Sequence, residues 1–119
     1  MVSGALLAQA RPSGTSAVEA YVAPAAQRVE VTRIVVANTT GSAVAMSLFH
    51  DDAGGDTFTA ATALYFAKSV PANDSIVIAA DAVGTGFPLS AGGQIGIQTA
   101  TADALTFSVY GVIDFRAAQ

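Results

Sequence analysis

The clearest structural signal in the sequence is the stretch LTFSVYGVIDF, residues 105–115. Apolar side chains share one face of it, namely Leu105, Phe107, Val109, Ile113 and Phe115. Polar or amphipathic side chains share the other face, namely Thr106, Ser108, Tyr110 and Asp114. A period of two is typical of a β-strand with one buried face, so we expect a strand over this stretch.

The segments before this stretch are also short and rich in strand formers, and Gly, Pro, Asn and Asp separate them. They are Thr15–Val22, Arg28–Asn38, Val44–Phe49, Ser75–Ala79 and Gln94–Thr99, with a further strand start at Thr57–Thr59. Ala60–Ser69 fits two patterns, because Leu64 and Lys68 have helical spacing whereas Leu64-Tyr65-Phe66 also fits a short strand. The β context and Pro71 favour a strand or an extended loop there.

These segments predict an all-β chain of seven to eight strands with no long helix. Turn signals spaced roughly 8–12 residues apart are typical of a β-sandwich or jelly roll. We therefore expect one antiparallel β-sandwich domain, jelly-roll-like, over residues 15–119. Residues 1–14 are expected to form an extended N-terminal arm, with Pro12 and Gly14 as its hinge.

The composition favours a protein that packs against other chains. Of the 119 residues, 52% are hydrophobic and only 12% are charged, so small and weakly polar side chains must cover much of the surface. Such a surface favours oligomerisation or assembly over an isolated monomer. The sequence contains no cysteine, which excludes disulfides and thiolate metal sites.

Two classes of partner are not expected from the charges and the apolar runs of the sequence. The net charge is −4, and the five basic residues are scattered: Arg11, Arg28, Arg33, Lys68 and Arg116. Nucleic-acid binding needs clustered cations, so it is not expected. No apolar run approaches the ~18 residues of a membrane helix, so no membrane partner is expected either.

Catalytic chemistry has no basis in the sequence, and we expect no enzyme and no cofactor. The single histidine, His50, lies on the same expected strand as Ser47, and no nucleophile elbow is present. A metal site is the stronger alternative, because His50, Asp51, Asp52 and Asp56 surround a Gly-Gly bend. Their spacing differs from an EF-hand, and a solvated hairpin tip is the favoured interpretation.

Contact residues are expected in two places. The arm supplies Leu6, Leu7, Arg11 and Pro12 as candidates for contact with a neighbouring subunit. Tyr110 on the polar face of the last strand is the other candidate. It is interpreted as a sheet-surface residue or one covered by a neighbouring subunit, and contact with a sugar or receptor is the alternative.

Several motifs resemble small structural proteins of tailed bacteriophages. They are the segments 20–25 (AYVAPA), 34–40 (IVVANTT), 47–51 (SLFHD), 63–65 (ALY), 70–72 (VPA), 92–97 (GGQIGI) and 107–111 (FSVYG). The likeness extends from Thr15 to Phe115. It implies a β-sandwich virion component, such as a capsid decoration (cement) protein, a head fibre or a tail-associated adaptor. The resemblance supplies no catalytic residue.

The leading hypothesis is therefore a phage capsid decoration protein, located in the virion, that binds and stabilises the assembled head. It would form a homo-oligomer, with a trimer favoured, on the phage major capsid protein. The alternatives are a tail or tail-tip protein, structural or receptor-binding, and a free carbohydrate-binding module.

Overall fold

The computed structural model describes residues 4–24, 28–52, 54–55, 57–79 and 87–114, and these ranges contain nine β-strands and no helix. The strands are β1 (Gly4–Ala10), β2 (Val18–Val22), β3 (Arg28–Asn38), β4 (Val44–Asp51), β5 (Ala63–Val70), β6 (Ser75–Ala79), β7 (Phe87–Leu89), β8 (Gln94–Thr99) and β9 (Leu105–Asp114). None of the described segments is a helix that could span a membrane.

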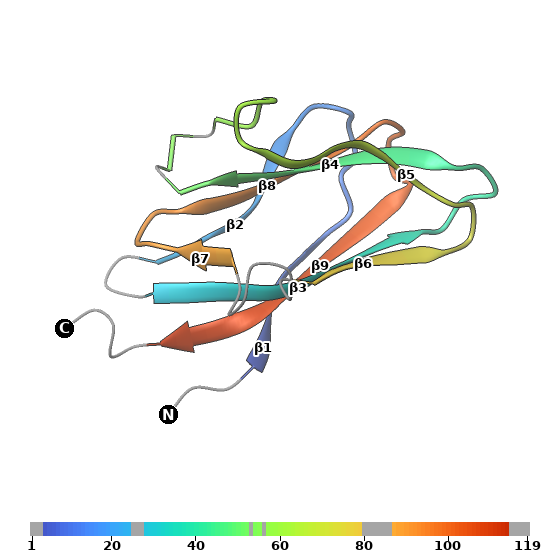
Figure 1. The fold of residues 1–119 in the computed structure, drawn as a ribbon. Helices are drawn as coiled ribbons and strands as arrows, with labels where there is room; N and C mark the ends of the chain where they lie inside the picture. Colours follow the sequence, from blue (N-terminus) through green and yellow to red (C-terminus); the bar gives the residue numbers. More distant parts are fainter. Residues whose placement is uncertain (1–3, 25–27, 53, 56, 80–86, 115–119) are drawn as a thin grey trace.

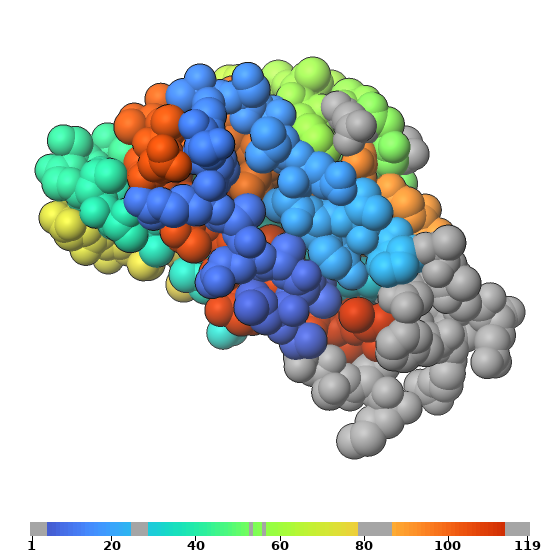
Figure 2. All heavy atoms as spheres, turned by 180° about the vertical axis from the view of Figure 1, so that it is seen from behind, coloured from blue at the N-terminus to red at the C-terminus, as the bar shows by residue number. Residues whose placement is uncertain are grey.

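The strands form two antiparallel sheets that face each other (Figure 1). Sheet A has the order β1-β9-β3-β6, and the short strand β7 also pairs with β3. Sheet B has the order β2-β8-β4-β5. Figure 2 shows the molecule from behind, where the N-terminal segments that contain β1 and β2 cover the surface between the two sheets.

The pairing follows one simple rule. The first strand pairs with the last, β2 pairs with β8, β3 pairs with β6, and β4 pairs with β5. The chain is therefore one long antiparallel hairpin, with its tip between β4 and β5, wound into a sandwich. This arrangement is a jelly roll, and it confirms the fold class that the strand pattern predicts.

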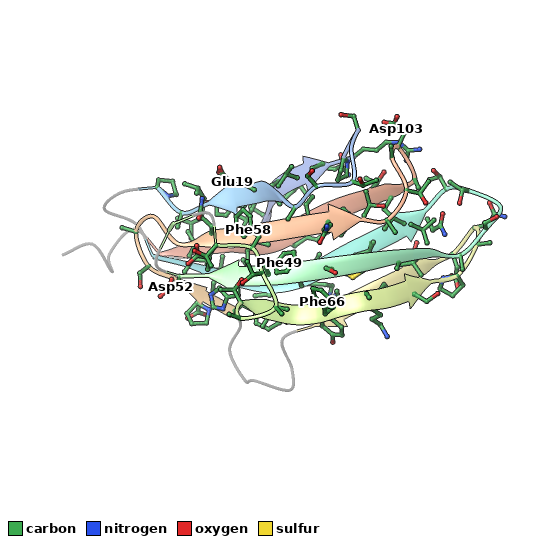
Figure 3. All side chains as sticks on the ribbon, turned by 90° about the horizontal axis from the view of Figure 1, so that it is seen from above. Glu19, Phe49, Asp52, Phe58, Phe66 and Asp103 are labelled. Atoms are coloured by element: carbon green, nitrogen blue, oxygen red, sulfur yellow. The ribbon has the colours of Figure 1, made fainter. Side chains whose placement is uncertain are left out.

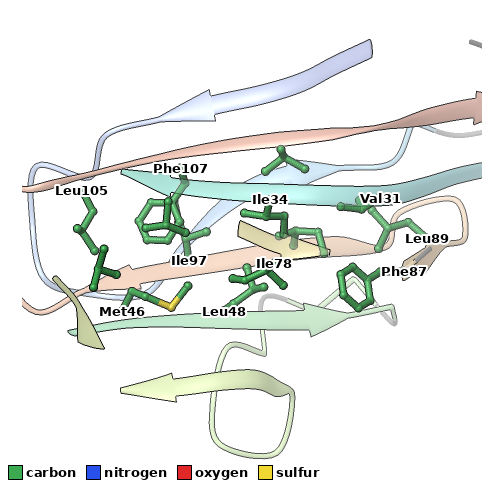
Figure 4. Close-up of a cluster of buried hydrophobic side chains, with 14 of the residues drawn as sticks. Val31, Ile34, Met46, Leu48, Ile78, Phe87, Leu89, Ile97, Leu105 and Phe107 are labelled. Carbon is green, nitrogen blue, oxygen red and sulfur yellow. The ribbon is translucent and has the colours of Figure 1, made fainter. Parts of the chain in front are cut away.

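The core fills the space between the sheets (Figure 4). Sheet A contributes Ile34, Leu105 and Phe107, and sheet B contributes Leu48 and Ile97, all with no exposed surface. Each such side chain contributes about 1.5–3 kcal/mol relative to an exposed one. The alternation along β9 is confirmed from residue 105 to residue 110, because Leu105, Phe107 and Val109 have no exposed surface while Tyr110 remains exposed. Ile113 is half-buried against the core, and Phe115 lies outside the described residues.

One end of the sandwich is joined by hydrogen bonds between its turns. Asp103 N donates to Pro12 O, Thr39 N to Ala104 O, and Asn73 N to Thr40 O, at 2.9–3.2 Å. The buried side chain of Asn38 completes the set: its Nδ2 donates to Ser42 O and Val70 O, and its Oδ1 accepts from Thr40 N. Four connections between strands are thereby tied together.

Two expectations differ from the structure. Residues 4–10 are extended, as the arm was expected to be, but they pair with β9 of the same chain. This pairing and the short strand β7 bring the strand number to nine. The boundary between arm and domain at residue 14 stays a prediction.

Thr57–Thr59 is not a strand, because Thr57 N donates to the carboxylate of Asp51 and Thr62 Oγ1 donates to Thr57 O, which holds this segment in a compact loop.

The ambiguous segment is resolved as a strand. β5 occupies Ala63–Val70 with two irregularities in its pairing with β4. β4 is buried on both faces, with Leu48 in the core and Phe49 covered from outside by Phe58 of the following loop, as Figure 3 shows.

Candidate functional site

The outer face of sheet A carries a row of side chains that solvent reaches. Leu6 of β1, Tyr110 of β9 and Arg33 of β3 are cross-strand partners in register. Leu6 is 52% exposed and Tyr110 is 38% exposed. Large apolar side chains with this much exposure are unusual when they gather on one face, and they indicate a contact surface.

β-Bulges flank Tyr110 on both sides. The β1–β9 register shifts between Leu6 and Ala8, and the β3–β9 register shifts between Val31 and Arg33. The extra residue on β3 is Thr32, whose Oγ1 donates to Tyr110 O at 3.3 Å. Bulges increase the local twist of a sheet, and here they accompany a groove of about 640 Å³.

The groove combines apolar walls with one positive charge. Its described lining is Ala5, Leu6, Thr32, Arg33, Val35, Tyr110 and Gly111. Gly111 is required here, because a Cβ would lie 2.3 Å from Glu30 O. Arg33 and the Tyr110 hydroxyl supply hydrogen-bond donors, and no carboxylate is among the described lining residues. The groove therefore suits an apolar group next to an anionic or hydroxyl-bearing one.

The same face continues toward β6. A second register row consists of Gln9, Ser108, Val35 and Val77. Gln9 Nε2 donates to Ser108 Oγ at 2.9 Å, and Val77 is 58% exposed at the far side of the sheet. Together with the first row, these residues form an apolar outer face, defined here by Leu6, Tyr110, Val35 and Val77.

The predicted contact residues separate into two groups. Leu6 and Tyr110 lie side by side on the outer face. Arg11 is exposed at its margin, where its guanidinium donates to Thr106 Oγ1 and to the carbonyl of Asp103. Leu7 is half-buried against the core, and Pro12 is buried, so their side chains are packed within this chain.

Sequence reasoning did not identify Arg33, Val35 and Val77. Alternation along one strand does not show which residues of another strand share its face. Val35 and Val77 are placed beside Arg33 only by the pairing of β3 with β6 and β9. No local signal contains that pairing.

The acidic segment at the end of β4 uses its polar groups to hold the neighbouring loops. Asp51 Oδ2 accepts from Gly55 N and Thr57 N, at 3.0 and 2.8 Å. Asp52 Oδ1 accepts from Ser90 N at 2.8 Å, and His50 Nε2 lies 2.9 Å from Pro88 O. Asp56 lies outside the described residues, and no three metal-ligating side chains gather among the others. The geometry is that of hydrogen-bonded turns.

The outer face of sheet B has a smaller feature. Phe66 is 62% exposed, beside a bulge where Ala67 N donates to Ser47 Oγ at 3.0 Å. The adjoining hollow measures about 200 Å³, and Figure 3 shows Phe66 on β5. Val18 and Val22 of β2 and Leu64 of β5 are exposed as well.

Comparison with known proteins identifies the fold. No protein-family model and no curated protein sequence matches the chain. The crystal structure of the T13 particle of infectious bursal disease virus matches with a TM-score of 0.50 and 16% identity, over 95% of this chain and 30% of that chain. The fold is like a virus capsid jelly roll.

Two further structures resemble this jelly roll less closely. The Gx strain of infectious bursal disease virus has a TM-score of 0.48 at 16% identity, over 95% of this chain and 32% of that chain. The capsid of Ralstonia phage GP4 has a TM-score of 0.45 at 12% identity, over 95% of this chain and 83% of that chain. The jelly roll described here thus spans less than a third of the length of the bursal disease virus chains.

Proposed function

We propose that this chain is a non-enzymatic structural protein of a tailed bacteriophage virion, specifically a capsid decoration (cement) protein that binds and stabilises the assembled head. The observation that carries the proposal is the apolar outer face of sheet A, left uncovered on a capsid-type jelly roll. The low charge of the chain also favours burial by neighbours.

The outer face would serve as the contact with the major capsid protein. Leu6, Tyr110 and Val77 would become buried, and Arg33 would pair with a carboxylate of the partner. A subunit that binds only the assembled shell raises the stability of the shell by its binding free energy. The subunits would form a homo-oligomer, with a trimer as the favoured state, and would require no cofactor.

Binding to purified capsids that lack the protein tests the proposal. Leu6→Asp places a charge in the contact and should weaken binding by about tenfold or more. Phe66→Asp is the matched control, because Phe66 is at least as exposed as Leu6 but lies on sheet B, and it should bind as the wild type does. Equal losses for both variants, or a particle image with only a few copies at the tail, would contradict the proposal.

A second candidate function is receptor or glycan recognition, by a tail-tip protein or a carbohydrate-binding module. The specific observation in its favour is the groove that places Tyr110 beside Arg33, since aromatic rings and arginine both recognise sugars and their acidic substituents. Titration of the isolated protein with neutral and acidic oligosaccharides distinguishes the two. Saturable binding that Tyr110→Ala abolishes would favour this candidate, and no binding would favour the capsid role.

A further inference from the structure

The edges of the two sheets are not equally protected. An edge strand exposes unpaired backbone groups, and proteins usually block such edges with bulges, charges or proline. The edge strands β1, β2 and β5 all have irregular pairing with their neighbours. β5 also carries Lys68, and β7 has Pro88 at its centre.

β6 is the exception among the described strands. It pairs with β3 without any register shift, from Ser75 opposite Ala37 to Ala79 opposite Arg33. Its sequence SIVIA contains no charge and no proline. A regular, apolar edge of this kind is suited to pairing with another strand.

The hydrogen bonds at the start of β6 show which backbone groups face outward. Asn38 N donates to Asp74 O at 2.8 Å, so the backbone carbonyl of Asp74 points toward β3. Successive residues of an antiparallel strand point alternately toward and away from the partner. The N–H and C=O groups of Ser75, Val77 and Ala79 therefore point away from β3. The Ser75 amide accordingly donates to the Asp74 carboxylate, at 2.8 Å.

The strand is also complementary to itself. Its residues are symmetric in size about Val77: small, Ile, Val, Ile, small. Antiparallel pairing of two copies about Val77 places Val77 opposite Val77, Ile76 opposite Ile78, and Ser75 opposite Ala79. No charge opposes another charge in this register, and a two-fold contact requires such self-complementarity.

We infer that β6 pairs antiparallel with β6 of a second copy of this chain, about a two-fold axis at Val77. The two sheets A then form one continuous sheet. The outward N–H and C=O of each Val77 bond to those of the other, and the two side chains, each 58% exposed in the single chain, cover one another. This inference does not depend on the proposed function.

The size of the contact determines when it forms. One five-residue strand buries less than the ~1,200 Å² of stable interfaces, so the pairing is weak in dilute solution. It strengthens where copies are already held side by side, because the effective concentration is then high. On a particle, a two-fold contact of this kind would link neighbouring oligomers.

Disulfide trapping tests the register directly, because the chain has no cysteine of its own. In the paired state the two Val77 Cα atoms lie about 5.5 Å apart, within the range that a disulfide spans. The two Ser75 Cα atoms lie about 14 Å apart, which a disulfide cannot bridge. Val77→Cys and Ser75→Cys are a matched pair, since both positions are exposed on the same strand.

The oxidation rates of the two variants are compared at high protein concentration, with circular dichroism to verify that both are folded. Val77→Cys should form the covalent dimer about tenfold faster than Ser75→Cys, because only the thiols at position 77 meet in the paired state. A mixture of Ser75→Cys and Ala79→Cys should form the heterodimer at the fast rate. Equal rates for Val77→Cys and Ser75→Cys, or no dimer from Val77→Cys, would overturn the inference.

Discussion

Ala67 is the residue whose backbone conformation fits its side chain least well. It has a φ of +54°, within the β5 bulge opposite Ser47. Left-handed backbone costs an L-residue about 1–2 kcal/mol, and glycine avoids that cost. Ala67→Gly should therefore raise the free energy of unfolding by about 0.5 kcal/mol after the greater chain entropy of glycine is subtracted.

The matched control is Ala45→Gly in the neighbouring strand β4, where the backbone has no positive φ. It should lower the free energy of unfolding by about 0.5–1 kcal/mol. Urea unfolding of both variants measures the difference. The same sign for both would show that the conformation of Ala67 is not strained.

Gly96 leaves room for the loop that carries Phe58 to pack over sheet B. A Cβ at this position would lie 2.4 Å from the ring of Phe58, which in turn packs against Phe49 with ring centroids 6.1 Å apart. Gly96→Ala should destabilise the protein by about 1–3 kcal/mol, because the ring must move. In a Phe58→Ala background the cost should nearly vanish, and a double-mutant cycle from chemical denaturation measures this coupling. Additive effects would mean that the ring does not occupy the space over Gly96.

Tyr21 links stability to alkaline pH. Burial raises the pKa of its phenol above the ordinary value of 10.0. The folded state then binds the proton more tightly than the unfolded state, so the stabilisation is present below pH 10 and is lost as the pH rises through the raised pKa. Tyr21→Phe should lose less stability than the wild type between pH 9 and about pH 11. Urea midpoints across this window measure the difference, and parallel curves would exclude the linkage.

At the scale of the elements, β1 forms one edge of sheet A by pairing with β9 of the same chain. Gln9 and Ser108 are register partners with hydrogen-bonded side chains. Replacing both with cysteine should give a disulfide within one chain, which closes a loop of about 100 residues and stabilises the fold by about 2–4 kcal/mol. A non-reducing gel should show a monomer. A covalent dimer would instead place β1 on a neighbouring subunit.

The elements that the sequence predicts best are those with local signals at both ends. β3, β6 and β8 have the expected bounds, because each is rich in β-branched residues and turn residues delimit it. β1 was expected only as an arm, since Gly-Ala-Leu-Leu-Ala-Gln-Ala has neither strand propensity nor alternation. Its pairing with β9 joins residues about 100 positions apart in the chain, and no short-range pattern encodes such a contact.

The candidate site was predictable to the same degree. Tyr110 stands out in an otherwise clear alternation, and Leu6 stands out in a small-residue segment. Arg33 and Val77 became part of the surface only through the strand order of sheet A. The sequence does not show that Asp51 and Asp52 bind backbone amides of neighbouring loops, because these contacts depend on the fold.

At the scale of the whole molecule, the wound hairpin predicts slow, cooperative folding. Three of its four strand pairs join segments far apart in the chain, and only β4 and β5 are consecutive. Folds dominated by such contacts form in milliseconds to seconds. Refolding from urea should follow a single exponential in that range, with the same rate by tyrosine fluorescence and far-UV circular dichroism. A faster phase by one probe would indicate that one sheet forms independently.

The tied turns at one end of the sandwich also constrain how the protein can vary. The connections near Pro12, Thr39, Asn73 and Asp103 share backbone hydrogen bonds, so lengthening any one of them displaces the others. Peptide insertions for surface display should therefore be rejected in these four connections, even though most of their residues are exposed.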